Sequence, residues 1–397
     1  MRVAIVGGGA AGFFLAINLK EMCPVADVTI FESALRPLRK VAVSGGGRCN
    51  CTNTFRSVRS LESVYPRGAR LMRRLLKSFG PEQAYSWFES HGVPLVVQAD
   101  ECVFPQAQDS QAIIDCFLCH ARNLGVKLIL QSRISSLGEL ADFDAVCITM
   151  GGQLRAEGLQ WLADGGLHIE PPVPSLFALS IADASLRSLM GTVVEQVEMG
   201  LPGTKHVASG TLLITHWGVS GPATLRLSSY AARHLHDCQY ACPLRINWLA
   251  MNDEQTLSLL HKTMQEHGRK LLSSLAPGCL PQRLWHHLLQ RALPERGEKR
   301  WAELSRRDLN RMVNTLSNDT YPISGRGIFK EEFVTCGGVS LADVNPATLQ
   351  SRKNPRLYFA GEVLDIDGVT GGFNFQAAWS TAYAVATALA RRDDLSQ

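Results

Sequence analysis

The first thirty-two residues constrain this chain most, because few folds accommodate their order of strand, glycine turn, helix and strand. An apolar run, Val3–Val6, leads directly into Gly7–Gly12, a segment that contains four glycines. A helical stretch, Phe13–Lys20, follows, and a second apolar run, Val28–Phe31, ends at Glu32. This order predicts a βαβ unit of a doubly wound α/β fold, in which the glycine turn faces a dinucleotide.

Each position in the glycine turn has a physical role. Gly7 permits the tight turn, Gly9 lets the backbone approach a pyrophosphate, and Gly12 lets the helix pack close to the strand. Ala10 and Ala11 begin the helix, whose unpaired N–H groups and partial positive charge attract phosphates. The turn therefore predicts a site for one pyrophosphate.

The acid that closes the second strand indicates which dinucleotides fit. Glu32 lies 20 residues after Gly12, where its carboxylate can accept hydrogen bonds from ribose hydroxyls. A carboxylate at this position argues against a ribose that carries a 2′-phosphate. The motif therefore leaves both FAD and NAD open.

Length and composition bound the class of protein. The chain has 397 residues, enough for two or three domains, and its 46% hydrophobic and 19% charged residues are typical of a globular protein. A net charge of +4 is too small to indicate a nucleic-acid partner by itself. Because the first apolar run contains the glycine turn, we expect neither a signal peptide nor a spanning helix, and we predict a soluble cytoplasmic protein without a membrane partner.

The cysteines indicate neither a disulfide framework nor a metal site. Eleven scattered cysteines in a chain of this length are typical of free thiols. Cys116 and Cys119 form a C-x-x-C pair inside a helical stretch, where packing is a better interpretation than redox chemistry. The His and Cys residues of segment 234–242 match no standard zinc spacing, so we predict no metal.

A second glycine-rich segment follows the βαβ unit. Residues 44–53 hold three consecutive glycines and then Arg, Asn, Thr and Asn. Such a loop can lay its backbone against a flat ligand while it supplies one cation and several amide and hydroxyl groups. The predicted cofactor contacts in this region are Lys40, Ser44, Gly46, Gly47 and Arg48. Arg48 and Asn50 are also candidates for groups that orient the cofactor or the substrate.

The end of the chain repeats the order of strand, glycine, acid, glycine pair and helix. A buried-type strand, Leu357–Ala360, runs into Gly361 and Glu362, and the pair Gly371–Gly372 precedes a long helix of small residues. One glycine turn holds one pyrophosphate, so a second site of this kind suits the other half of FAD. These segments favour FAD over NAD.

The terminal residues therefore provide predicted contacts to the flavin half. Glu362 can hold ribityl hydroxyls. The N–H groups around Gly372, Phe373, Asn374 and Phe375, at a helix N-terminus, can stabilise negative charge on a reduced flavin. Two positions in the middle of the first domain complete the predicted cofactor contacts: Ile134, which begins a short extended piece, and Gly151, which follows a strand.

The middle of the chain departs from the α/β pattern after the prolines of 171–174. We predict a discontinuous FAD-binding domain (1–175 and 336–397), an inserted β-rich domain (176–250 and 320–335) and a helical part of the insert (251–319). His216, in the insert, is a candidate proton donor. Two basic stretches fit exposed helix faces better than a nucleic-acid site: few aromatic residues are interleaved in Arg67–Lys77, and Glu303 and Asp308 balance Arg306–Arg311.

Six segments, spread over nearly the whole chain, form one recognisable series. They are residues 7–12, 40–53, 215–222, 337–339, 358–368 and 371–376. Together they resemble the HI0933-like family of bacterial NAD(P)/FAD-dependent oxidoreductases. The departures are small: Cys51 occupies a site that varies in the family, and Phe373 stands where tyrosine is common.

The resemblance implies a fold and a chemistry. The fold is a glutathione-reductase-like FAD-binding Rossmann domain, interrupted by an inserted β-barrel-like plus helical domain. The cofactor is FAD, and the activity is flavin-dependent oxidoreduction. One branch of the family reduces carbon–carbon double bonds conjugated to a ketone in steroid acids, and we do not carry that substrate over.

The leading hypothesis is an FAD-dependent oxidoreductase that moves a hydride between NAD(P)H, flavin and an unidentified small-molecule acceptor, with an enone as one option. No second G-x-G-x-x-G occurs, so we expect NAD(P)H to visit transiently. The alternatives are a tRNA-modifying flavoprotein that uses the two basic stretches, and a flavin-binding regulator without turnover. The choice between NADH and NADPH and the oligomeric state stay open.

Overall fold

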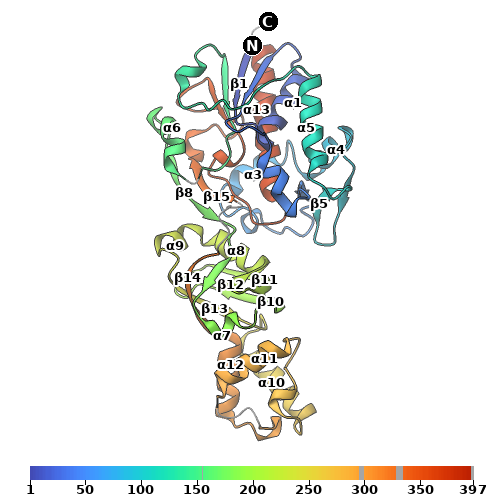
Figure 1. The fold of residues 1–397 in the computed structure, drawn as a ribbon, viewed down its shortest axis with the longest axis vertical. Coiled ribbons are helices and arrows are strands. Elements are labelled where there is room, and N and C mark those ends of the chain that lie inside the picture. Colours follow the sequence, from blue (N-terminus) through green and yellow to red (C-terminus); the bar gives the residue numbers. More distant parts are fainter. Residues whose placement is uncertain (154, 295–298, 328–333, 395–397) are drawn as a thin grey trace. The chain divides into compact units, whose positions relative to one another are not determined.

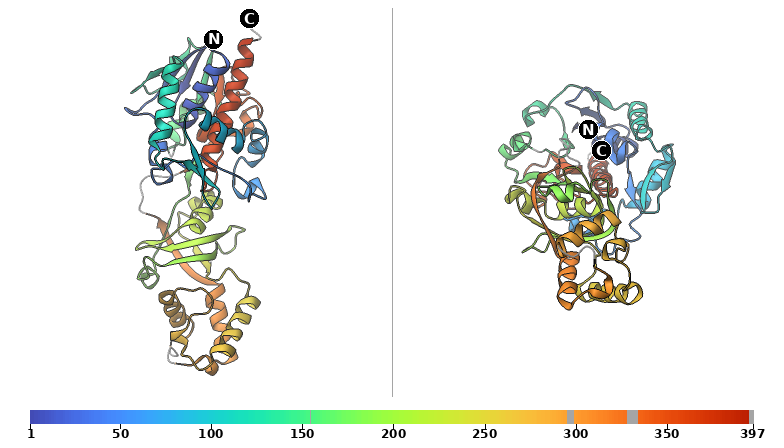
Figure 2. Two further views of the ribbon diagram at one scale, coloured as in Figure 1. Left: turned by 90° about the vertical axis from the view of Figure 1, so that its right-hand side faces the viewer. Right: turned by 60° about the horizontal axis from the view of Figure 1, so that its bottom comes forward.

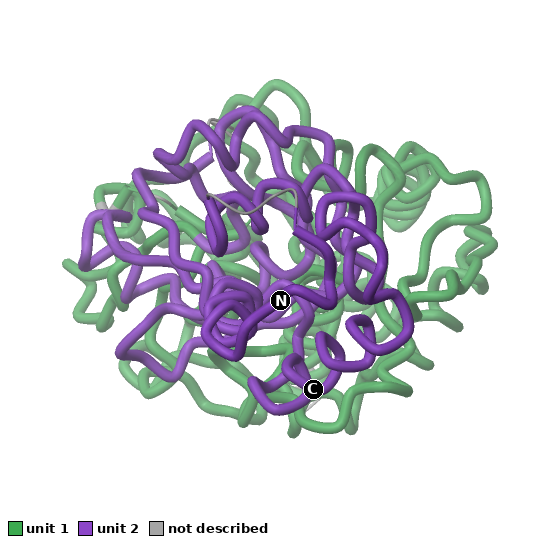
Figure 3. Tube along the Cα trace, turned by 90° about the horizontal axis from the view of Figure 1, so that it is seen from below, with its two compact units in different colours: residues 1–174, 333–397 green, residues 175–332 purple. Residues whose placement is uncertain are grey.

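The computed structural model describes residues 1–153, 155–294, 299–327 and 334–394, and the chain forms two compact units (Figure 3). Unit 1 comprises residues 1–174 and 333–397, and unit 2 comprises residues 175–332. Part of the β-rich stretch predicted at 320–335 lies outside the described residues. Among the residues that are described, no helix combines the length and the apolar character that crossing a membrane requires.

A five-stranded parallel sheet forms the centre of unit 1 (Figure 1). Its strands in spatial order are β16 (Leu357–Phe359), β7 (Ala145–Ile148), β1 (Arg2–Val6), β2 (Asp27–Phe31) and β6 (Lys127–Ile129). The first and last strands to enter the sheet, β1 and β16, come from opposite ends of the chain and both flank β7. The predicted Rossmann domain is confirmed.

Helix α1 (Ala10–Met22) is buried along most of its length, from Ala11 to Leu19. It lies between α5 (Gln111–Asn123) and α13 (Phe373–Asp394), as Figures 1 and 2 show. The ring of Phe13 stacks 6.3 Å from Phe117 of α5, and Phe14 lies 5.1 Å from Trp379 of α13. Apolar side chains cover almost the whole circumference of α1. A helix of this sequence is therefore stable only when neighbouring elements bury it on several sides.

The rest of unit 1 surrounds this layer. Strands β3 (Thr52–Asn53), β5 (Cys102–Pro105) and β4 (Leu95–Val97) form an antiparallel sheet, and β8 (Ile169–Ser175) pairs with β15 (Val334–Val339). The remaining helices are α2 (Arg39–Val43), α3 (Ala69–Leu75), α4 (Pro81–Ser90) and α6 (Gln160–Asp164).

Helix α3 begins two residues later than the basic stretch predicts. Gly68 has a φ of +79°, a left-handed conformation that ends the preceding segment, and Arg67 pairs with Asp367 in an isolated antiparallel bridge. A side chain at Gly68 would meet Ile366 at 2.7 Å. Arg67 therefore belongs to a turn packed on the terminal segment, and not to an exposed helix face.

Unit 2 contains the inserted barrel. Its strands close in the order β10 (Val193–Gly200), β11 (Val207–Ile214), β12 (Gly218–Ser220), β9 (Leu179–Ile181), β14 (Asp319–Arg326) and β13 (Pro243–Asn247). Two helices, α8 (Pro222–Tyr230) and α9 (Ala232–Asp237), follow β12. Ser220 pairs with Leu213 inside the barrel, and Gly221 is the N-cap of α8.

In the described residues of the second part of the insert, the α-helices are α10 (Asp253–His267), α11 (Gln282–Ala292) and α12 (Arg306–Ser317). A short helix, α7 (Ala184–Arg187), follows β9. The inserted β-barrel plus helical architecture is confirmed within unit 2.

A buried carboxylate joins the helical part to the barrel. Asp319, 4% exposed, accepts hydrogen bonds from the indole N–H of Trp248 (2.9 Å), the hydroxyl of Tyr321 (2.5 Å) and the guanidinium of Arg291 on α11. The Arg291 guanidinium also lies 4.7 Å from the centre of the Tyr321 ring. This cluster ties a helix to two strands through one acid.

Replacing Asp319 by Ala is therefore expected to lower the free energy of unfolding by about 3 kcal/mol, because three donors lose their shared acceptor. Urea titration followed by tryptophan fluorescence measures the loss. Asp237→Ala removes an exposed carboxylate at the end of α9 and is expected to leave the free energy of unfolding nearly unchanged. Equal effects of the two substitutions would contradict a structural role for Asp319.

Candidate cofactor site

The predicted cofactor residues of unit 1 gather where the parallel strands end. The Gly7 N–H donates to Phe31 at the end of β2, Thr149 N–H donates to Val6, and Ala360 N–H donates to Ile148. The ends of β1, β2, β7 and β16 are therefore joined by backbone hydrogen bonds. In open α/β sheets this carboxyl edge is where dinucleotides bind.

Backbone atoms pack closely against two glycines of the turn, and a third glycine has open space beside it. A Cβ at Gly12 would lie 2.1 Å from the Gly7 carbonyl oxygen, and one at Gly7 would lie 2.6 Å from the Met150 Cα. The Thr149 hydroxyl donates to the same Gly7 carbonyl at 2.9 Å. A Cβ at Gly9 would meet nothing within 4 Å. The turn is thus tightly packed on one side, with space at the glycine predicted to approach pyrophosphate.

Ala10 and Ala11 form the start of α1, and no side chain of the N-cap residue Gly9 occupies the first turn. Ala11 also packs closely on the terminal segment, since a Cβ at Gly361 would lie 2.9 Å from the Ala11 Cβ. These positions fit the predicted phosphate contact.

Glu32 is held at the end of β2 by backbone donors. Its carboxylate accepts from the Gly8 N–H at 2.8 Å and from the Ala34 N–H at 2.7 Å. The Glu32 carbonyl also accepts from Ser132 N–H, which places the segment that leads to Ile134 beside it. Ile134 is buried, but the predicted extended piece forms no strand there. The fixed carboxylate suits a ribose contact.

Glu362 joins three separate segments at the same edge. One carboxylate oxygen pairs with the Lys40 ammonium at 2.7 Å, and the other accepts from Thr335 N–H at 2.8 Å. The glycine pair after β7, Gly151–Gly152, lies against this carboxylate. A Cβ at Gly152 would be 2.7 Å from it, and one at Gly151 would be 3.9 Å from it. The predicted ribityl contact would share this acid with two protein donors.

The glycine-rich loop is locked to the start of α13. A Cβ at Gly372 would lie 2.3 Å from the Thr52 carbonyl oxygen, and the Thr52 hydroxyl donates to the Gln376 side chain at 2.6 Å. With its amide nitrogen turned toward the carbonyls of Thr52 (2.8 Å) and Val103 (3.2 Å), Asn50 accepts the Gly372 N–H at 3.2 Å. Asn50 therefore binds backbone on both sides of this contact, which indicates a positioning role.

Arg48 is held within its own loop. Its guanidinium lies 4.3 Å from the centre of the Phe104 ring and donates to the Gly45 carbonyl and the Gln108 side chain. Gly46 and Gly47 have φ values of +69° and +83° and no atom within 4 Å of a built Cβ. The loop thus presents open backbone beside one cation, as the sequence predicts.

Ser44 and the aromatic residues around α13 are occupied by the protein itself. The Ser44 hydroxyl donates to the Val41 carbonyl at 2.8 Å. Asn374 makes two hydrogen bonds of 2.8 Å with the backbone of Gly368, and the Phe375 ring stacks on Trp379. The Phe373 carbonyl accepts from the Tyr65 hydroxyl at 2.9 Å. Because these groups are engaged within the protein, the backbone N–H groups of this turn are the groups of α13 that can bind a ligand.

An ion pair that sequence reasoning missed stabilises the approach to α13. Arg67 makes a two-pronged hydrogen-bonded pair with Asp367, whose side chain is fully buried. Burial alone would lower the pKa of Arg67, but the carboxylate of Asp367 raises it. The acid in the Asp-Gly pair 367–368, set within an apolar and glycine-rich segment, was the signal that could have indicated this partner.

His216 belongs to unit 2 and is not among the residues that the sheet edge brings together. It is exposed in the turn before β12, with its ring 4.3 Å from that of Trp217. Its role as a proton donor stays a prediction.

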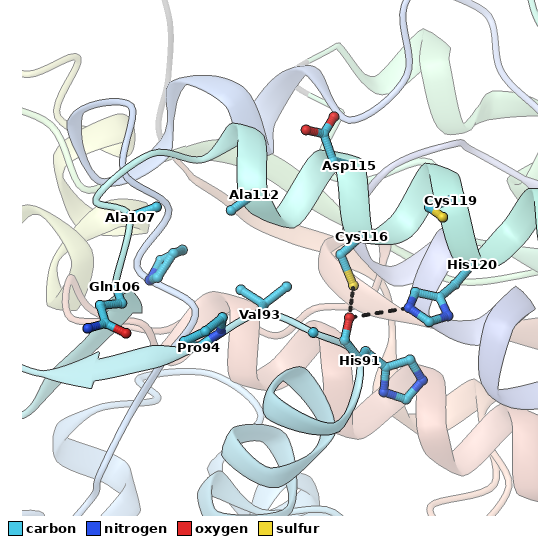
Figure 4. A pocket seen from close by; sticks show the side chains of 12 residues that line it. His91, Val93, Pro94, Gln106, Ala107, Ala112, Asp115, Cys116, Cys119 and His120 are labelled. Carbon is cyan, nitrogen blue, oxygen red and sulfur yellow. Dashed lines mark hydrogen bonds between the residues drawn. The ribbon is translucent and has the colours of Figure 1, made fainter.

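The C-x-x-C pair lies in another part of unit 1, in a pocket formed by α5 and the segments around His91 and Pro105 (Figure 4). Cys116 is buried, its thiol donates to the His91 carbonyl, and burial raises its pKa to about 12. His120 contacts the same carbonyl at 3.3 Å. Because the thiolate is the reactive form, this environment favours packing over redox chemistry.

Replacing Gly372 by Ala is expected to abolish FAD retention. The new methyl group would overlap the Thr52 carbonyl, and the φ of +88° already disfavours a side chain. Gly166→Ala is the matched control, because Gly166 has a φ of +89° but open space around it. FAD released per mole of purified protein measures the difference. Equal FAD content in both variants would contradict the importance of this contact.

Replacing Arg67 by Met is expected to lower the free energy of unfolding by about 3 kcal/mol, because the Asp367 charge stays buried without its cation. The double substitution Arg67→Met and Asp367→Leu removes both charges and is expected to cost less than the single one. Chemical unfolding measures both, with the exposed neighbour Arg70→Met as the control. A double variant less stable than the single one would contradict this explanation.

Comparison with known proteins places this geometry in a family. Residues 1–388 match the model of the HI0933-like protein Rossmann domain. A 3-dehydro-bile acid delta(4,6)-reductase of Clostridium scindens is 26% identical over 98% of this chain and 99% of its own length. A ribosomal RNA dihydrouridine synthase of Escherichia coli is 29% identical over 96% of both chains, and one of Haemophilus influenzae is 26% identical over 98% of both.

The fold has also been seen in solved structures. A 3-ketosteroid delta1-dehydrogenase of Sterolibacterium denitrificans aligns over 98% of this chain and 99% of its own with a TM-score of 0.52, at 11% identity. At this identity the likeness shows a shared fold alone. The match over residues 1–388 shows more: the chain belongs to the HI0933-like family of flavoprotein oxidoreductases, and its cofactor is FAD.

Proposed function

We propose that this protein is an FAD-dependent reductase that saturates a carbon–carbon double bond conjugated to a carbonyl group, with NAD(P)H as the donor. The names of its relatives support this reaction type. One is a delta(4,6)-reductase, and two form dihydrouridine. Uridine carries a ring double bond conjugated to a carbonyl, and dihydrouridine lacks it. A single chemistry, addition of two hydrogens across an activated double bond, is common to these names.

The observation that carries the proposal is the contact between the glycine-rich loop and the start of α13. It places open backbone at Gly46 and Gly47 on the same loop that packs against the N-terminus of a 22-residue helix. The partial positive charge of that helix end favours negative charge on a reduced flavin. FAD, when bound, accepts a hydride from the nicotinamide and passes it to the acceptor.

Different residues along the sheet edge bind different parts of the cofactor and the acceptor in this proposal. In this proposal Gly7–Gly12 and Glu32 bind the ADP half, while Lys40 and Glu362 hold the middle of the cofactor. Arg48, fixed over Phe104, orients the acceptor carbonyl. Asn50 acts by positioning the loop, and His216 is the candidate that returns a proton to the product.

A second candidate function is the modification of a uridine within RNA. The two dihydrouridine synthases among the relatives support it, and the one from Escherichia coli is 29% identical. The RNA alternative expected from the sequence was a tRNA-modifying enzyme, whereas these names indicate ribosomal RNA. The two candidates share one site and differ in what delivers the double bond to it.

Anaerobic reduction of the purified holoprotein by NADH and by NADPH, followed by addition of acceptors, tests the reaction. We expect rapid bleaching of the flavin by one nicotinamide. Enones should then restore its colour, and matched saturated ketones should not. Reoxidation that requires quinones and ignores every conjugated double bond would contradict the proposal.

Arg48→Ala separates cofactor binding from turnover. We expect unchanged FAD content and reoxidation by the enone about tenfold slower or more, because the acceptor loses its orienting cation. Arg59→Ala, which removes an exposed arginine of the same unit, is the control. Unchanged reoxidation in the Arg48 variant would remove its proposed role.

A further inference from the structure

The net positive charge of this chain comes from one unit. Residues 175–332 contain 18 Lys and Arg against 14 Asp and Glu, whereas the rest of the chain contains 22 of each. The whole net charge of +4 therefore belongs to unit 2, and unit 1 has no net charge. The small net charge of the whole chain does not indicate a polyanionic partner, but unit 2 has a local excess of positive charge.

Part of this excess is concentrated by a backbone contact in the helical part of the insert. Leu271 and Arg300 form an isolated antiparallel bridge, with Leu272 N–H donating to Lys299 and Trp301 N–H donating to Lys270. Two short segments that lie about 30 residues apart in sequence are thereby held side by side. Each contributes two adjacent cations. We name this surface the basic bridge; it consists of Arg269, Lys270, Lys299 and Arg300.

Three cations of the basic bridge are exposed above a buried base, and the Arg300 guanidinium is held in place by the Arg269 carbonyl, to which it donates at 2.9 Å. Arg269, Lys270 and Arg300 are exposed. Beneath them Trp301 is fully buried, stacked parallel to Trp285 at 6.0 Å, and the Trp285 indole donates to the Leu272 carbonyl. The exposed charges therefore lie above a tightly packed base.

The acids described near the basic bridge do little to neutralise it. Glu303 accepts the Arg300 backbone N–H, and Asp308, 1% exposed, caps α12 through Ser305 and lies 3.7 Å from the Lys299 ammonium. In the next turns Arg306, Arg307 and Arg311 add exposed positive charge along α12. Among the residues that the structure describes, no carboxylate forms an ion pair with Arg269, Lys270 or Arg300, which leaves these cations available to phosphate.

We propose that the basic bridge is a docking surface for the phosphate backbone of RNA. Closely spaced Lys and Arg side chains on a rigid support bind polyanions by neutralising phosphates and releasing counterions. Leu271 is the one large apolar side chain exposed among them, too little to insert into a membrane. The inference names the substrate class of the proposed reductase and rests on that function: the reactive double bond would belong to a uridine within RNA.

Binding of the holoprotein to an unmodified ribosomal RNA transcript, measured by fluorescence anisotropy over a range of salt concentrations, tests the proposal without turnover. The variant Arg269→Glu, Lys270→Glu and Arg300→Glu is expected to raise the Kd at least tenfold. It should also flatten the slope of log Kd against log salt by about 3, since three phosphate contacts are lost. A milder variant with Gln at the same three positions should show the same trend if the Glu variant does not fold.

The matched control is Arg70→Glu, Arg74→Glu and Lys77→Glu, which makes the same change in net charge at exposed positions of α3 and the turn that follows it. It is expected to keep the RNA affinity. Equal loss in both variants, or none in the bridge variant, would overturn the proposal, as would binding to phosphatidylserine vesicles but not to RNA. Reoxidation by a soluble enone should be unchanged in the bridge variant. Failure of that reaction in the unmodified protein would instead overturn the reductase function, whatever the RNA affinity.

Discussion

The contact between the glycine-rich loop and the first turn of α13 is the interaction on which the rest of the site depends. The Thr52 carbonyl lies where any side chain at position 372 would be, and Thr52 and Gln376 are joined by a buried hydrogen bond. Trp379, one turn further, donates to the Cys51 carbonyl. Because the loop belongs to the first fifty-three residues and the helix to the last twenty-five, the site exists only when both ends of the chain have come together.

Two ion pairs complete this closure. Lys40 and Glu362 are separated by 322 positions, and Arg67 and Asp367 by 300, yet both pairs lie beside the terminal strand or the loop that follows it. The first is partly exposed and contributes little stability by itself. The second is buried, so losing either partner is costly, and it fixes the direction from which the chain enters α13. The long insert lies between these partners in sequence, yet the parallel sheet of unit 1 is continuous.

Much of the fold could be predicted because local patterns determine it. The order of strand, glycine turn, helix, strand and acid in residues 1–32 appears in the structure almost residue for residue, and β16 lies within the predicted strand 357–360. The pairing of Arg67 with Asp367 was not predicted, because nothing local distinguishes Arg67 from an exposed arginine and the signal for its partner lies 300 positions away. The predicted ligand contact of the Asn374 backbone N–H stays a prediction, whereas the hydrogen bonds of its side chain to Gly368 were not indicated by the sequence. Charge averaged over the whole chain concealed the excess in unit 2.

We propose that FAD spans the sheet edge from the glycine turn to the start of α13. Hydrogen–deuterium exchange of the apoprotein, with and without added FAD, tests this claim. Slower exchange on FAD binding is expected in three segments: 7–12, 44–53 and 361–376. Protection limited to residues 7–12 and β2, with no change in the loop or in α13, would describe a site for a nucleotide alone and would contradict the claim.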